Sequence, residues 1–122
     1  MIHPVIVHVG VLVGLAGLSA VSAHAAEPAP ARRTELVRMV RQDCGSCHGM
    51  TLKGGLGPSL LPGDLHGKPD AFLVTTILEG RQGTAMPGWA RFMSRDEAVW
   101  IVGKLRNGFP ALVRGALPEV AQ

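Results

Sequence analysis

The chain has 122 residues, and its 12 Lys and Arg against 9 Asp and Glu give a formal net charge of +3, so its length allows one domain. Two cysteines are too few for a disulfide scaffold, and there is no collagen period, no block of like charge and no heptad run long enough for a coiled coil. With no Tyr and 4% aromatic residues, the core is marginal, and we expect a bound group to fill part of the interior.

The N-terminal segment is typical of an export signal. Residues 1–25 contain no Lys, Arg, Asp or Glu and end in Ala23-His24-Ala25, whose small residues fit a signal peptidase site. We expect residues 1–25 to be a cleaved signal peptide, which makes the mature protein periplasmic. The segment also lacks the usual basic n-region, so an uncleaved anchor is the alternative, because a bilayer needs about 20 apolar residues. Residues 26–33, with Pro28 and Pro30, are predicted to be a mobile leader.

The remaining pattern predicts helices separated by loops rich in Gly and Pro, without strands. A first helix is expected from an N-cap at Thr34 to Gly45, a second with Pro69 at its first position and Gly80 just past its end, and a third from the capping box Ser94-x-x-Glu97 to Asn107. Loops 49–67 and 80–93 are long, and loops of that length are usually functional. The folded body is therefore predicted over residues 34–108, and no element is assigned to the tail, residues 109–122. The second helix is expected to present an apolar face of Phe72, Leu73, Ile77 and Leu78.

The sequence of residues 44–48 is Cys-Gly-Ser-Cys-His, a C-x-x-C-H motif. Two thiols one helical turn apart can add to the two vinyl groups of a haem, while the adjacent His48 offers its imidazole to the iron. The alternatives are a thioredoxin-like redox pair or disulfide, which needs no His directly after the motif, and a zinc site, for which only His66 remains as a further strong ligand. The export signal favours haem, because thioether attachment is extracytoplasmic chemistry.

A haem that transfers electrons needs a sixth ligand, and position in the chain discriminates among the candidates. Met86 is our choice because it lies 38 residues after the motif, in a loop that Pro87 stiffens. A Met/His pair raises the reduction potential relative to a pair of histidines. Met39 and Met50 lie too close to the motif to cross to the opposite haem face, so we expect them to be packing residues. Met93 and His66 are the next candidates after Met86, in that order.

Several neighbours of these ligands are predicted to support the haem. The carbonyl of Pro58 is expected to accept a hydrogen bond from the ring of His48 and so to orient it. Trp89 and Arg81 flank the Met86 loop and could bind the haem propionates, although a packed Trp and a solvated Arg account for them equally well. The crevice walls are predicted to be Leu60, Leu61, Phe72, Ile77, Trp100 and Ile101.

Together, residues 42–49, 54–58, 67–69 and 83–89 resemble the small class I cytochromes c, and more narrowly the cytochrome c55X family. Members of that family are small periplasmic monohaem cytochromes associated with cytochrome cd1 nitrite reductase in denitrifying bacteria. The resemblance covers residues 34–107 and implies an all-α fold of three to four short helices around one covalently bound haem c. It implies thioethers at Cys44 and Cys47, axial ligation by His48 and Met86, and a carbonyl of Pro58 that orients the histidine. The tail after Asn107 is longer than the family leads us to expect.

The function that follows is one-electron transfer by a monomeric carrier that is not an enzyme. The resemblance implies the nitrite reductase, or an assembly factor that matures its d1 haem, as redox partner. A nucleic-acid partner is not expected, because aromatic residues are few and the chain carries an export signal, and a membrane is expected only if the signal stays as an anchor. The alternatives are a haem protein that binds small gases, in which Met86 is labile or absent from the iron, and a thiol-disulfide oxidoreductase.

Overall fold

The computed structural model describes residues 27–110, so the predicted signal peptide and the tail beyond Pro110 lie outside the described residues. Five α-helices and one π-helical segment make up the described part, which contains no strand. In chain order they are α1 Pro30–Met39, η1 Val40–Cys44, α2 Gly45–His48, α3 Pro62–Leu65, α4 Asp70–Glu79 and α5 Arg95–Arg106. None of these helices is both long and apolar enough to cross a bilayer.

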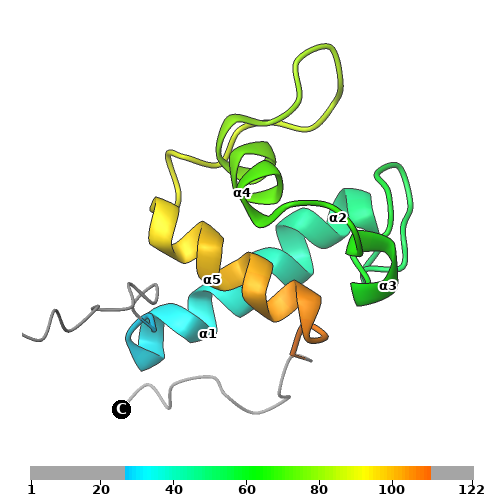
Figure 1. Ribbon diagram of the computed structural model, residues 1–122. Coiled ribbons are helices and arrows are strands. Elements are labelled where there is room, and N and C mark those ends of the chain that lie inside the picture. The colour runs from blue at the N-terminus through cyan, green and yellow to red at the C-terminus, as the bar shows by residue number, and fades with distance from the viewer. Residues whose placement is uncertain (1–26, 111–122) are drawn as a thin grey trace, which may run out of the picture.

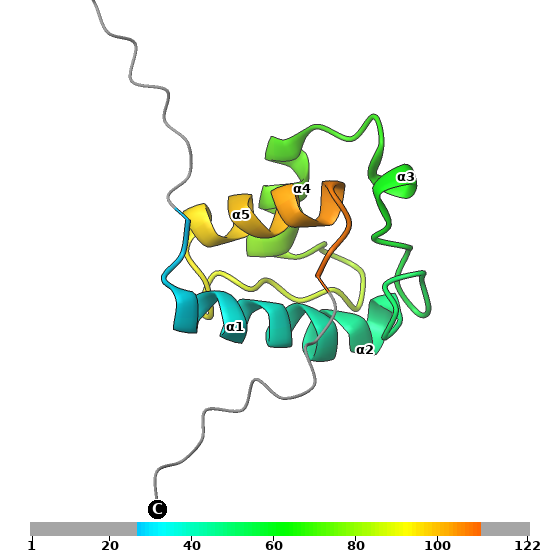
Figure 2. The same ribbon diagram turned by 90° about the horizontal axis from the view of Figure 1, so that it is seen from below.

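Helices α1, η1 and α2 follow one another without a break and form a single rod, which α5 crosses (Figures 1 and 2). Helix α4 packs on α5, and α3 lies against the C-terminal half of the same helix, so α5 is the element around which the others gather. The loop before α3 lies beside the α2 end of the rod, and the loop after α4 runs back along the rod to the start of α5 (Figures 1 and 2).

The predicted N-cap at Thr34 is wrong, and so is the leader that was expected to extend to residue 33. Helix α1 begins at Pro30, whose missing N–H suits the first turn, and the hydroxyl of Thr34 donates back to the carbonyl of Pro30 at 3.2 Å. Arg32 accounts for the early start, because its guanidinium binds the carboxylate of Glu97 through two hydrogen bonds of 2.6 and 3.1 Å. Those bonds tie the first turn of α1 to the first turn of α5.

The rod also ends later than predicted, at His48 in place of Gly45. Gly45 is buried inside the helix, and the left-handed turn comes at Gly49, with φ +85°. The π-helical segment η1 lies immediately before the cysteine motif. Such wide turns occur frequently at functional sites, because they shift the register of the side chains that follow.

Helix α5 confirms its predicted boundaries, and α4 begins one residue later than predicted, because Pro69 is its N-cap and not its first residue. In α5 the hydroxyl of Ser94 accepts the N–H of Glu97 at 3.2 Å, and the carboxylate of Glu97 accepts the N–H of Ser94 at 2.7 Å, which is the predicted capping box. Helix α4 starts directly after Pro69 and stops at Gly80, with φ +71°. A single hydrophobic cluster holds the helices together; it consists of Leu36, Val40, Leu52, Leu65, Val74, Met93, Ala98, Trp100, Ile101, Val102 and Leu105.

The predicted buried face of α4 is only partly right. Val74 is the residue of α4 that is buried in the protein core, whereas Phe72 is 46% exposed. Trp100 was expected to wall the crevice, but it lies in the core with the ammonium of Lys104 5.2 Å from its ring centroid. Periodicity located an apolar helix in each case and did not distinguish its two apolar sides.

The start of the tail returns to the rod. Arg41 donates to the carbonyl oxygens of Phe109 at 2.5 Å and Pro110 at 2.9 Å, and its guanidinium lies 5.6 Å from the centroid of the Phe109 ring. The two tail residues that the structure describes are thus anchored to η1.

Candidate haem site

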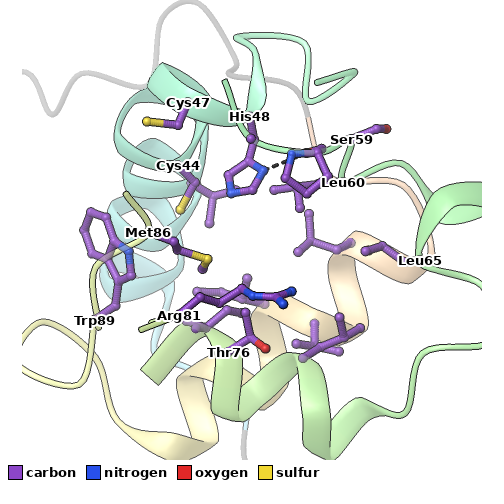
Figure 3. Close-up of a pocket in the computed structure, with 18 of the residues that line it drawn as sticks. Cys44, Cys47, His48, Ser59, Leu60, Leu65, Thr76, Arg81, Met86 and Trp89 are labelled. Atoms are coloured by element: carbon purple, nitrogen blue, oxygen red, sulfur yellow. Dashed lines mark hydrogen bonds between the residues drawn. The ribbon is translucent and has the colours of Figure 1, made fainter. Parts of the chain in front are cut away.

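A cavity of about 660 Å³ lies between the rod, α4 and the two long loops. In Figure 3, Cys44, Cys47 and His48 come from the rod, and Met86 and Arg81 lie on the other side of the cavity. Its volume falls within the range of about 300 to 1,000 Å³ that is usual for small-molecule sites, and its walls are mostly apolar. The cavity is therefore large enough for a cofactor and is lined by the residues that the motif singled out.

The cysteine motif lies on one helical turn, because Cys44 ends η1 and Cys47 belongs to α2. Both cysteines line the cavity, and no disulfide joins them. Burial, and secondarily the neighbouring Asp43 carboxylate, raises the pKa of the Cys44 thiol to about 11. A redox-active dithiol needs the opposite shift, because the thiolate is the nucleophile.

Neither a thioredoxin-like centre nor a zinc site finds support in the described part of the chain. A thioredoxin-like centre needs a βαβ frame, and residues 27–110 contain no strand. A zinc site needs four ligands, and no three His, Cys, Asp or Glu side chains among those residues lie close enough together to hold a metal ion.

His48 is held in one orientation. Its side chain is buried, and its Nδ1 lies 2.7 Å from the carbonyl oxygen of Pro58, the contact expected from the sequence. A carbonyl can only accept, so Nδ1 carries a proton, and in the neutral ring Nε2 then has the lone pair. That is the tautomer of a histidine that binds a metal through Nε2.

The glycine-rich loop of residues 54–58 packs against the imidazole ring of His48. The N–H of Gly57 donates to the carbonyl of Cys47 at 2.8 Å, and the N–H of Gly54 donates to the carbonyl of His48 at 2.8 Å. A Cβ placed on Gly57 would lie 2.8 Å from both Cε1 and Nδ1 of His48. Only glycine fits there, and this steric role of Gly57 was not foreseen, although the run of glycines marked the loop as one of close approach.

The Met86 loop is fastened to the end of α4. The N–H of Trp89 donates to the carbonyl of Ile77 at 3.0 Å, and the backbone of Gly80 lies so close that a Cβ there would be 2.6 Å from the carbonyl oxygen of Met86. The thioether of Met86 points into the cavity from the side opposite His48 (Figure 3). One nitrogen lone pair and one thioether thus approach the same space from two independent elements.

Comparison with known proteins identifies the family. Residues 31–103 match the family described as "Cytochrome C oxidase, cbb3-type, subunit III". Cytochrome c55X of Pseudomonas aeruginosa is 51% identical over 81 residues, which cover 66% of this chain and 68% of that protein. Cytochrome c55X of Paracoccus denitrificans is 47% identical over 94 residues, 77% of this chain and 87% of the relative. The chain is a class I c-type cytochrome of the cytochrome c55X family.

Solved structures agree with this cytochrome c55X assignment. The c-type cytochrome NirC is 51% identical, with a TM-score of 0.65 over 66% of this chain and 95% of NirC. Dihydro-heme d1 dehydrogenase NirN, solved in complex with DHE, is 38% identical, with a TM-score of 0.53, and the match covers 57% of this chain but only 15% of that enzyme. The dehydrogenase of Pseudomonas aeruginosa matches 72 residues of this chain at 40% identity. A segment of a much larger enzyme therefore has the same cytochrome fold.

Cytochromes of this family carry one covalently bound haem c, and the residues around the cavity fit that group. The two thiols, the free Nε2 of His48 and the apolar walls are the donor set and the surroundings that a covalently attached haem requires. A haem held in this cavity would also fit the low aromatic content of the chain, since the group itself would supply a large apolar surface to the interior.

The remaining predicted site residues divide into two groups. Trp89, Arg81 and Pro58 line the cavity, and so do the predicted wall residues Leu60, Phe72, Ile77 and Ile101. The wall prediction was wrong for Leu61 and Trp100, which do not line it. Thr76 and Thr84 line the cavity too but were not anticipated. Thr84 precedes Met86 by two residues, a spacing typical of a Ser/Thr turn, so the sequence did contain a signal for it.

The alternative sixth ligands lie less favourably. Met93 lines the cavity but is 5% exposed and belongs to the hydrophobic core. His66 is exposed and lies away from the cavity, beside Arg106. Met39 packs against the core, and Met50 is 61% exposed.

Proposed function

We propose that Cys44 and Cys47 form the two thioethers, that His48 and Met86 are the axial ligands, and that the protein is an electron carrier and not an enzyme. When bound, the haem supplies a one-electron couple between ferrous and ferric iron. The observation that carries this proposal is the approach of the His48 Nε2 lone pair and the Met86 thioether to one cavity from opposite sides. Trp89 and Arg81, which also line it, are proposed to bind the propionates through the indole N–H and the guanidinium.

The proposed partners are the cytochrome cd1 nitrite reductase and an enzyme that matures its d1 haem. The relation to dihydro-heme d1 dehydrogenase favours the second, because a segment of that enzyme is built like this chain. A dehydrogenase removes two electrons and two protons from its substrate, whereas a monohaem carrier accepts one electron. Two molecules of oxidised carrier are therefore needed for each turnover.

The proposed location is the periplasm, with residues 1–25 removed on export and the mature protein a monomer. Haem attachment to C-x-x-C-H and the apolar segment before Ala26 support this proposal. Intact mass of the protein from a periplasmic extract tests it. A mass that includes residues 1–25 together with one haem would identify the segment as an uncleaved anchor.

The ligand assignment is tested by absorption spectra of the periplasmically expressed protein and of Met86→Ala. We expect a low-spin c-type spectrum in which the ferric form shows the near-infrared band of thioether bound to iron, and we expect Met86→Ala to lose this band. Met93→Leu is the matched control, because it removes the other thioether of the cavity and should keep the band. A high-spin ferrous spectrum and tight binding of carbon monoxide by the wild-type protein would show that it is a gas-binding haem protein and not an electron carrier.

The partner assignment is tested by mixing. Ferric carrier should be reduced by a dihydro-haem d1 dehydrogenase and its substrate with a stoichiometry of two carriers per substrate. If the dehydrogenase does not reduce the ferric carrier, but nitrite reductase rapidly oxidises the ferrous carrier, the protein acts in nitrite reduction itself.

A further inference from the structure

The turn that carries Met86 has little packing to hold its shape. Residues 81–85 are all exposed, and a Cβ at Gly83, in the middle of the turn, would meet no atom within 4 Å. Backbone hydrogen bonds close the turn at its base, where the N–H of Arg81 donates to the carbonyl of Met86 at 3.1 Å. Hydrogen bonds, more than side-chain packing, therefore determine where the Met86 backbone lies.

Thr84 adds two hydrogen bonds inside this turn. Its hydroxyl donates to the carbonyl of Arg81 at 2.7 Å and accepts the N–H of Met86 at 3.3 Å. Its own N–H donates to the carbonyl of Arg81 at 3.1 Å. One hydroxyl thus bridges the first and last residues of the turn, and it does so next to the residue whose side chain enters the cavity.

We propose that Thr84 is a positioning residue that holds the Met86 sulfur on the iron, an inference that rests on the proposed ligation by Met86. The methionine side chain is unbranched and has three rotatable bonds, so its reach to the metal is defined only if its backbone is fixed. Without the Thr84 hydroxyl, the Met86 N–H and the Arg81 carbonyl turn to water, which costs little stability because the turn is exposed. The loss is local, and its result is a methionine that leaves the iron more often.

This local loss should depend on the oxidation state. A thioether is a soft ligand and prefers ferrous to ferric iron, so the ferric bond breaks first when the loop is loosened. A hydrogen bond of this kind changes such an equilibrium by at most about a factor of ten. We therefore expect an external ligand that competes with Met86 to bind ferric Thr84→Val about three to ten times more tightly than the wild-type protein.

The experiment titrates imidazole into the ferric holo-cytochrome and follows the near-infrared thioether band. Thr84→Val should show the tighter imidazole binding, and Thr84→Ser, which keeps a hydroxyl, should return to the wild-type value. Thr34→Val is the matched control, because it also removes a Thr hydroxyl bound to a backbone carbonyl, on α1 and away from the cavity. Its imidazole affinity should equal that of the wild-type protein.

Two results would overturn the inference, and they are distinguishable from each other. If the wild-type band is present and is lost in Met86→Ala, but Thr84→Val binds imidazole like the wild-type protein, the ligand assignment holds and Thr84 has no positioning role. If the wild-type ferric protein has no thioether band, both the ligation and the role of Thr84 are wrong. Equal unfolding midpoints of Thr84→Val and Thr84→Ser would show that the change in imidazole binding is not a consequence of general destabilisation.

Discussion

Gly57→Ala tests the seating of the proximal histidine most directly, because the added group is a single methyl. Gly57 has no unusual backbone conformation, so alanine brings no torsional strain there. Its Cβ, however, would lie 2.8 Å from Cε1 and Nδ1 of His48 and 3.3 Å from Cγ, closer than non-bonded carbon and nitrogen atoms approach. Either the imidazole or the loop must move. The imidazole is hydrogen-bonded at 2.7 Å to the carbonyl of Pro58, the residue that follows Gly57, so movement of either would disturb this bond.

The expected cost has two parts. Forcing a methyl into a filled interior costs about 1 to 3 kcal/mol. Weakening the hydrogen bond from the buried His48 ring to Pro58 costs about 1 to 3 kcal/mol more, because the carbonyl and the N–H lose their partner. The sum of about 2 to 6 kcal/mol is a large share of the stability of a domain of this size, which is typically about 5 to 15 kcal/mol.

The assay is guanidinium unfolding of the ferric protein, followed by far-ultraviolet circular dichroism and by the haem absorption. With a slope of about 3 kcal/mol per molar, the Gly57→Ala midpoint should fall by about 1 M. Gly63→Ala is the control, since it changes the same residue type in the short helix α3, where a Cβ would meet nothing within 4 Å. Alanine at residue 63 should leave the midpoint unchanged or raise it slightly. Equal midpoints for both variants would refute the close contact between the loop and the imidazole.

Two further predictions concern the loop and the helix ends. Gly80→Ala should abolish the ferric thioether band, because its Cβ would lie 2.6 Å from the carbonyl oxygen of Met86. Gly83 has a similar positive φ but open space around it, so Gly83→Ala should keep the band. Loss of the band in both variants would show that backbone strain alone causes the effect. Glu97→Gln should cost about 1 to 2 kcal/mol at pH 7, because Arg32 lowers the pKa of that carboxyl to about 2 from 4.5. Because folding lowers the pKa of Glu97, the ionised carboxylate stabilises the folded protein above the unfolded pKa, and this stabilisation is lost as the pH falls from about 4.5 toward 2. The free energy of unfolding, measured across that range, should therefore fall less steeply with pH in Glu97→Gln than in the wild-type protein. Parallel pH profiles would show that the ion pair contributes nothing to acid unfolding.

The helix boundaries that the sequence predicted correctly are those fixed by local chemistry. The capping box at Ser94 is formed by residues three apart, and Pro69 and Gly80 mark the ends of α4 by their own backbone preferences. The predicted start of α1 was wrong because the actual start depends on a residue far away in the sequence. Thr34 satisfied the local rule for an N-cap, but Arg32 binds Glu97, 65 residues away, and so stabilises a helix that begins one turn earlier. No pattern within the first helix contains that information.

The two apolar sides of α4 show a second limit of the sequence. Periodicity found the helix, but it could not say that Val74 packs against protein while Phe72 lines the cavity. Apolar side chains that contact a cofactor and those that contact a core have the same spacing and the same hydrophobicity. The distinction requires knowing where the cofactor lies, and that is fixed by residues on other elements.

The site itself followed from the sequence further than the packing did, because its chemistry constrains the chain at short range. Cys44, Cys47 and His48 lie within five residues, and ten residues separate His48 from the Pro58 carbonyl that orients it. A motif of this kind has to keep its spacing to react at all, so the spacing is readable without a fold. What the sequence did not contain is how the two halves of the site meet. The structure places a π-helical segment directly before the motif and a solvent-exposed turn, bridged by the hydroxyl of Thr84, directly before Met86. If the titration with imidazole bears out its role, the strength of the iron–thioether bond in this fold is determined as much by a hydrogen bond in an exposed loop as by the cavity around the haem.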